Sequence, residues 1–190
     1  MNFAKYRIKL NEALNTVDET SVERLYQLIL RNTHKEIFIF GNGGSAAIAN
    51  HWVCDAAKGI GEDTNIDCKI TSLSTNVPLI TAIANDIGYE FIFSKQLEYL
   101  QPIKGLAIAI SSSGNSKNII EGLNAAKSYG LYTAALVGFT GGGASNIADV
   151  TVHVKSDNYG LVEDSHMAIL HSISQRIRSA YSLNKTTLKL

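Results

Sequence analysis

Short apolar runs alternate along this chain with longer segments whose apolar residues recur at helical spacing. The short runs lie at residues 36–41, 68–73, 106–111, 133–138 and 150–154. The first of them ends in a glycine, and runs of this length are typical of strands that are buried on both faces. The pattern therefore predicts five parallel strands.

Helical segments connect the predicted strands. They lie at residues 45–58, 77–85, 88–100, 116–129 and 162–181, and residues 1–33 form one or two further helices. Thr20 or Ser21 is a candidate N-cap within that N-terminal region. Strands that alternate with helices favour an α/β fold in which helices cover both faces of a parallel sheet. We expect a single domain over 1–190, with N-terminal helices at 1–34 and an α/β core with a C-terminal helix at 35–190.

Composition narrows the class of partner. Lysine and arginine together number 17, as do aspartate and glutamate, so the formal net charge is zero. No net field attracts nucleic acid or an anionic membrane, and a bound anion must be held by local groups. Two cysteines without paired spacing favour neither a disulfide framework nor a zinc knuckle. With no apparent signal peptide and no apolar run of transmembrane length, we expect a cytoplasmic protein.

The first predicted strand runs into a glycine-rich loop, Gly-Asn-Gly-Gly-Ser-Ala-Ala at residues 41–47, which opens a helix. Glycines let the backbone approach a ligand closely, and a helix N-terminus offers free N–H groups to an anion. The spacing matches neither a Walker loop nor a dinucleotide-binding fingerprint. Asn42, Gly43, Gly44 and Ser45 are therefore candidate phosphate-binding residues. The alternative is a turn that only changes the direction of the chain.

A second loop of this kind follows the third strand, where Ser-Ser-Ser-Gly-Asn-Ser spans residues 111–116. An N-cap needs one serine, whereas Ser111, Ser112, Ser113 and Ser116 supply four hydroxyls ahead of the helix. Ligands of open α/β sheets bind at the carboxyl ends of the strands, where both loops are expected to lie. The two loops together predict a phosphate site built from neutral donors, without an arginine.

These motifs resemble the sugar isomerase (SIS) domain family and, within it, the phosphoheptose isomerases. The motifs that carry the resemblance over nearly the whole chain are the two loops, the helix with Asn50 and His51, the segment that ends in Asn85 and Asp86, and the segment from Glu163 to His171. The resemblance implies a flavodoxin-like, doubly wound, five-stranded sheet and a homotetramer. It also implies isomerisation of sedoheptulose 7-phosphate to D-glycero-D-manno-heptose 7-phosphate, with a divalent metal, usually zinc, at the site.

The resemblance also assigns chemistry to individual residues. His51, Asp55, Glu163 and His171 match metal or catalytic positions, with Asp55 as the base and His171 as the general acid. Isomerisation through an enediol needs such a pair. His51 and Asp55 are four residues apart and so share one face of the predicted helix. Asn85 and Asp86 are expected either to contact a sugar hydroxyl or to form a helix C-cap turn.

Four departures from the family pattern leave alternatives open. Asp55 stands where this branch has glutamate, and Glu163 stands where it has glutamine. Lys58 and Gly59 lie where an arginine is expected, and the segment at 158–160 is shorter than the family's. Glu163 could have taken over as the base, or another phosphosugar could be the substrate. A non-catalytic module of the initiator-associating type is the third possibility.

The spacing of Glu163 and His171 bears on assembly. Eight residues on one helix correspond to about 12 Å along its axis and about 80° around it. Because metal–ligand bonds are only about 2 Å long, one helix can hardly bring both side chains to one ion. We therefore predict a homo-oligomer in which a neighbouring chain supplies one of them.

Overall fold

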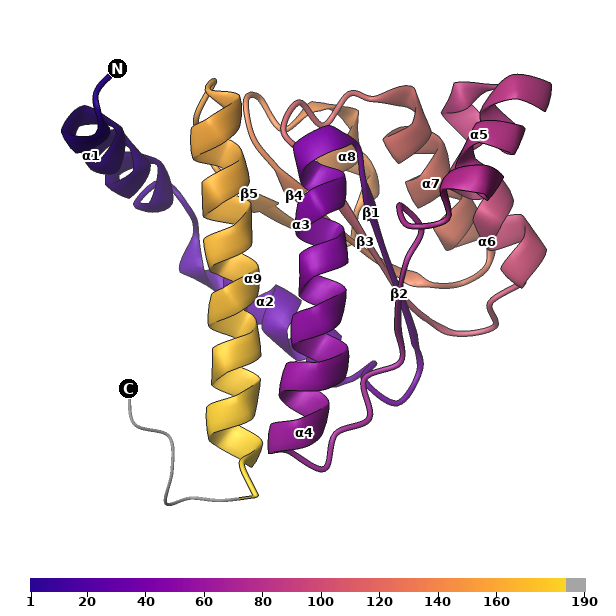
Figure 1. The fold of residues 1–190 in the computed structure, drawn as a ribbon, viewed down its shortest axis with the longest axis horizontal. Coiled ribbons are helices and arrows are strands. Elements are labelled where there is room, and N and C mark those ends of the chain that lie inside the picture. Colours follow the sequence, from indigo (N-terminus) through magenta and orange to yellow (C-terminus); the bar gives the residue numbers. More distant parts are fainter. Residues whose placement is uncertain (184–190) are drawn as a thin grey trace.

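The structure, a computed structural model, describes residues 1–183; the rest of the domain predicted over 1–190 lies outside them. Its centre is an all-parallel five-stranded sheet in the order β2-β1-β3-β4-β5 (Figure 1). The strands are β1 (Glu36–Gly41), β2 (Ile70–Ser72), β3 (Gly105–Ser111), β4 (Tyr132–Val137) and β5 (Val150–His153). The five predicted strands and the flavodoxin-like order are thereby confirmed.

Helices cover both faces of this sheet. On one face lie α1 (Phe3–Leu14), α2 (Glu19–Leu30), α3 (Gly43–Cys54) and α9 (Tyr159–Tyr181), and on the other lie α5 (Val77–Asp86), α6 (Ser94–Leu100), α7 (Lys117–Ser128) and α8 (Gly142–Ile147). In Figure 1, α3 and α9 run side by side in front of the sheet. This arrangement fulfils the expected doubly wound architecture.

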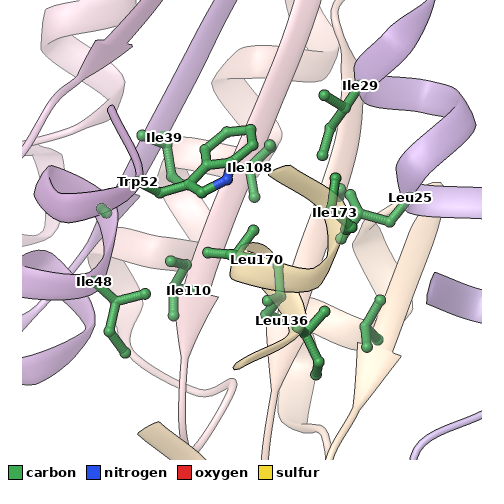
Figure 2. Close-up of a cluster of buried hydrophobic side chains, with 14 of the residues drawn as sticks. Leu25, Ile29, Ile39, Ile48, Trp52, Ile108, Ile110, Leu136, Leu170 and Ile173 are labelled. Atoms are coloured by element: carbon green, nitrogen blue, oxygen red, sulfur yellow. The ribbon is translucent and has the colours of Figure 1, made fainter. Parts of the chain in front are cut away.

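Alternate residues of each strand enter two separate cores. On β1, Ile37 and Ile39 face α3 and α9, whereas Phe38 and Phe40 face the helices of the opposite layer. Because both faces of the strand are covered, the sequence shows a continuous apolar run there. Figure 2 shows the first core, in which Trp52 of α3 packs with the isoleucines of the central strands and α9 contributes Leu170 and Ile173.

The predicted helix at 45–58 is longer and less regular than expected. After α3, the chain continues through a π-helical turn, η1 (Asp55–Ile60), into α4 (Gly61–Asp63). The predicted helix at 88–100 is a 3₁₀ turn, η2 (Tyr89–Phe91), followed by α6. The glycines at 141–143 lead into a short helix, α8, which begins at Gly142 with Gly141 as its N-cap. The cap of α2 is Asp18 instead of Thr20 or Ser21.

The order of the strands places two loops next to each other. β1 and β3 are neighbours in the sheet, while the chain leaves β1 toward β2 on one side and leaves β3 toward β4 on the other. The carboxyl ends of β1 and β3 therefore flank the point where the winding direction changes, which is where open α/β sheets bind ligands.

Among the described helices, none combines the length and the apolar character that a membrane crossing requires.

Candidate functional site

The loops after β1 and β3 enclose a small pocket of about 120 Å³, referred to below as the loop pocket. It is lined by Asn42, Ser45, Ile110, Ser111, Ser112, Ser113, Ser116, Tyr159 and Glu163. Six of these residues were predicted from the loops, and Glu163 enters from α9. Larger cavities lie elsewhere on the surface, but the loop pocket is where the predicted donors converge.

The serines of the second loop can still donate to a ligand. Ser111 Oγ accepts a hydrogen bond from the backbone N–H of Gly114 at 3.1 Å, and Ser113 Oγ accepts one from Asn115 at 3.2 Å. Each hydroxyl hydrogen is thus available for a further acceptor. Ser116 occupies the N-cap of α7, yet its side chain does not cap that helix. The loop is therefore a set of neutral donors that a phosphate can use.

Asn42 has a role that was not predicted. It is the N-cap residue of α3 without a side-chain cap bond, because its amide pairs with that of the buried Asn118 on α7. Asn42 Nδ2 donates to Asn118 Oδ1 at 2.9 Å, and Asn118 Nδ2 donates to Asn42 Oδ1 at 2.8 Å. Tyr89 Oη donates to the same Asn42 Oδ1 at 3.1 Å. These bonds join the first loop to the helix that follows the second loop.

A second group of polar side chains lies farther along α3 and α9. His51 Nε2 and His171 Nε2 are 3.0 Å apart, and Asp55 Oδ2 lies 3.5 Å from the first and 3.2 Å from the second. We call these three residues the His–Asp–His cluster. Their side chains are 50, 29 and 44% exposed in the order His51, Asp55, His171. The cluster thus lies open on the surface of the single chain.

Packing between α3 and α9 holds this cluster together. Trp52 is fully buried, and its Nε1 donates to Ser174 Oγ at 2.9 Å. This bond fixes the register of the two helices one residue beyond His51 and three residues beyond His171. The π-helical turn begins at Asp55 itself, and such turns occur frequently at functional sites.

The cluster fits a metal ion by distance and by chemistry. Its three ligand atoms lie within 4.8 Å of one another. Ligands about 2.0–2.1 Å from a tetrahedral zinc lie roughly 3.3 Å from each other, close to the three separations described above. Imidazole nitrogens with a carboxylate oxygen are a set that zinc accepts, and three protein ligands leave a position for substrate.

Glu163 does not join the cluster. Its carboxylate lies in the loop pocket against Gly44, where a Cβ added to the glycine would be 2.5 Å from Oε1. Glu163 and His171, eight residues apart on α9, thus lie in separate places within one chain, as the spacing predicted. However, the structure brings together His51, Asp55 and His171 within one chain, so a neighbouring chain is not needed to assemble them.

Asn85 and Asp86 are placed apart from both groups. They are the last two residues of α5, both are exposed, and Asn85 Nδ2 donates to Asp86 Oδ1 at 2.7 Å. Neither of them lines the loop pocket. Their position fits the helix-end alternative, and contact with a sugar hydroxyl stays a prediction.

Three residues of the site were missed by sequence reasoning: Tyr159, Tyr89 and Asn118. Tyr159 lines the pocket at the start of α9, with its ring centroid 4.9 Å from that of Phe139. Of these three residues, Asn118 could have been suspected from the sequence. It lies two residues after Ser116 on the predicted helix, and an amide buried in a helix is rarely left without a hydrogen-bond partner.

Comparison with known proteins identifies the family and the fold of the chain. Residues 2–138 match the family model described as SIS domain. The chain is 41% identical over 170 residues to the phosphoheptose isomerase of Sulfurimonas denitrificans, covering 89% of this chain and 85% of that protein. It is 34% identical to that of Helicobacter pylori, covering 95 and 94%. The structure of phosphoheptose isomerase GmhA from Neisseria gonorrhoeae superposes with a TM-score of 0.82 at 28% identity, covering 90 and 92%.

Proposed function

The chain belongs to the SIS domain family, and we propose that it is a phosphoheptose isomerase that converts sedoheptulose 7-phosphate to D-glycero-D-manno-heptose 7-phosphate. One observation of the structure carries this proposal. The same two helices, α3 and α9, present a phosphate-sized pocket at their N-terminal ends and a cluster of acid–base residues farther along.

The spacing of these two parts suits an open-chain heptulose phosphate. Glu163 in the loop pocket and His171 in the cluster are eight residues apart on α9, or about 12 Å along its axis. With single bonds of about 1.5 Å, an extended seven-carbon sugar phosphate reaches roughly 10 Å from its first carbon to its phosphorus. A triose phosphate reaches only about half as far and could not bridge the two parts.

The loop pocket is proposed to hold the phosphate. Ser45, Ser111, Ser113 and Ser116 would donate hydroxyl hydrogens to its oxygens, and the N-terminus of α3 would add backbone N–H groups. Hydrogen bonds to a charged group are worth about 1.5–3 kcal/mol each. A few such bonds can therefore anchor a phosphate without an arginine.

Asp55 and His171 are proposed to move the protons of the isomerisation. Asp55 would take a proton from one of the two reacting carbons and return it to the other, while His171 would transfer a proton at the oxygen atoms. Both histidines approach Asp55 through Oδ2, which leaves Oδ1 as the atom that can accept the proton. Glu163 lies in the loop pocket, away from His171, and this position favours Asp55 over Glu163 as the base.

A divalent metal, with zinc as our choice, is proposed as the cofactor. His51, Asp55 and His171 would hold it through Nε2, Oδ2 and Nε2, and the distances between these atoms fit its coordination. His171 would then transfer its proton at Nδ1, the ring nitrogen that the ion leaves free. When bound, the ion supplies a Lewis acid that polarises the carbonyl and stabilises negative charge at the enediol stage.

We further propose that the protein assembles as a homotetramer in the cytoplasm. Proton transfer is favoured in a site that excludes water, whereas the cluster is open on the single chain. A second copy placed over α3 and α9 would close it. The two free cysteines, Cys54 and Cys68, suit a reducing compartment.

The second candidate is an isomerase of a different phosphosugar, which the shorter base Asp55 and the carboxylate at 163 favour. The test is a panel of pentulose, hexulose and heptulose phosphates, incubated with zinc or with a chelator. Conversion of sedoheptulose 7-phosphate at the highest kcat/KM supports the proposal. A higher kcat/KM for a shorter ketose phosphate supports the second candidate.

A further inference from the structure

Glu163 is an unexpected neighbour for a bound phosphate. Among the described residues that line the loop pocket, it is the one with a charged side chain, and no lysine or arginine lines this pocket. A carboxylate accepts hydrogen bonds and does not donate them, and the same holds for a phosphate dianion. The two groups therefore repel when they lie in one small pocket.

The side chain is held in this position by the packing of α9. Val162, the preceding residue, is fully buried, and a Cβ added to Gly138 would meet its methyl groups at 2.6 Å. One turn earlier, the ring of Tyr159 packs on that of Phe139. The absence of a side chain at Gly44 provides the space in which the carboxylate lies. The charge is thus part of the wall of the pocket.

A sugar phosphate differs from a free phosphate in the groups that it brings to this wall. Its hydroxyls can donate to Glu163, whereas inorganic phosphate offers that carboxylate only like charge. We propose that Glu163 is a specificity-determining residue by which the loop pocket selects a phosphorylated polyol over a free phosphate ion. This inference rests on the proposed function, because it takes the loop pocket to be the phosphate site.

The selection corresponds to a measurable difference between the two affinities. A hydrogen bond to a charged group changes affinity by about tenfold to a hundredfold. Replacing Glu163 by glutamine keeps the shape and removes the charge. The dissociation constant of inorganic phosphate should then fall, and the preference for the polyol phosphate should shrink by about tenfold or more.

Asp164 offers a matched control on the same helix. Its carboxylate accepts a hydrogen bond from Tyr6 Oη at 2.6 Å, and it does not line the loop pocket. The substitution Asp164→Asn removes the same charge one residue away. A second variant, Gly44→Ala, adds a methyl group where the carboxylate now lies, and only the flexible end of Glu163 needs to shift.

The experiment is a calorimetric titration of the full chain with two probes: inorganic phosphate and a heptitol 7-phosphate, which has the hydroxyls and cannot isomerise. For each protein we compare the ratio of the two dissociation constants, after circular dichroism has shown that the variant is folded. We expect the preference for the heptitol phosphate to fall at least about tenfold in Glu163→Gln, to fall in Gly44→Ala, and to stay unchanged in Asp164→Asn.

Other outcomes overturn the inference. An unchanged ratio in Glu163→Gln would do so even if that variant had lost turnover, since Glu163 would then act in catalysis and not in selection. An equal change of the ratio in Asp164→Asn would show that the effect comes from the net charge of the protein and not from the position of Glu163. Failure of the wild-type chain to bind either probe would overturn it together with the phosphate pocket. Binding with the expected ratios but no conversion of sedoheptulose 7-phosphate would contradict only the proposed function.

Discussion

Asp55 and His171 of one chain lie 3.2 Å apart, between the carboxylate Oδ2 and the imidazole Nε2. They are separated by more than a hundred residues and come from η1 and α9. The buried hydrogen bond from Trp52 to Ser174 keeps α3, which η1 continues, in register with α9. The proposed base and the proposed acid therefore lie within one subunit, even if the complete site also needs a neighbour to cover it.

This relationship predicts the outcome of a complementation experiment. Asp55→Asn chains and His171→Asn chains, each inactive, should remain inactive after mixing under conditions of subunit exchange. Every site in the mixed oligomer would lack one of the two groups. Activity of the mixture is the measurement, and native mass spectrometry of differently tagged chains is the control for exchange. Recovery of activity would show that the two residues act from different subunits.

Removal of the metal should lower the folding stability of the protein as well as inactivate it. A ligand that binds only the folded state raises its stability, by about 2.7 kcal/mol at a concentration of 100 times Kd. We expect zinc to raise the melting temperature of chelator-treated wild type and to leave that of His51→Ala nearly unchanged. Thermal unfolding with the metal content determined in parallel measures this. An equal shift in both proteins would place the ion elsewhere.

The Asn42–Asn118 pair should control how well the two loops act together. Asn118→Ala leaves the amide of Asn42 without its buried partner, which costs about 1–3 kcal/mol of folding stability. Because the first loop loses its attachment to α7, we also expect substrate affinity to fall, with KM rising more than kcat falls. Urea unfolding and steady-state kinetics measure the two effects. Asn124→Ala, an exposed change on the same helix, is the control.

Much of the fold could be predicted from the sequence because parallel strands that are covered on both faces have continuous apolar runs. The strand order depends on long-range pairing, and the resemblance supplied it. The π-helical turn at Asp55 could not be predicted, since the residues at 55–60 show no pattern that distinguishes it from an α-helix. In the folded chain this turn lies against α9.

The two candidate loops were predicted because small and hydroxyl residues cluster after two strands. The Asn42–Asn118 pair that joins them was not predicted. In the sequence Asn118 is an ordinary helical residue, and its partner Asn42 lies 76 positions away. The placement of Glu163 in the loop pocket was missed for a related reason. Its direction depends on where α9 begins, and that helix starts at Tyr159, three residues before the predicted start.

His166 should make the stability of the protein depend on pH. The residue is fully buried, and no described group makes a hydrogen bond with either ring nitrogen. Burial, with a smaller contribution from His153, lowers the pKa of His166 from 6.5 to about 4. The Val137 carbonyl, outside hydrogen-bond geometry, opposes this shift.

The direction of this pH dependence follows from proton binding in the folded and the unfolded chain. Between pH 6.5 and 4 the unfolded chain binds a proton at this histidine that the folded chain does not, so stability falls as the pH falls through this window. The loss from this one group approaches about 3 kcal/mol. Urea unfolding at several pH values should show a shallower decline for His166→Gln than for wild type. Parallel declines in the two proteins would assign the effect to other groups.

Proton transfer by Asp55 and His171, proposed above for the isomerisation of a heptulose phosphate, is observed most directly when the reaction runs in deuterated water. Sedoheptulose 7-phosphate is incubated with zinc-loaded wild type, Asp55→Asn, His171→Asn and Glu163→Gln, and the product is followed by NMR. We expect heptose 7-phosphate from the wild type with solvent deuterium at C2, and rates about 10²–10⁴-fold lower for Asp55→Asn and His171→Asn. Full activity of Asp55→Asn beside an inactive Glu163→Gln would make Glu163 the base, and no product from the wild type would exclude a heptulose phosphate as the substrate.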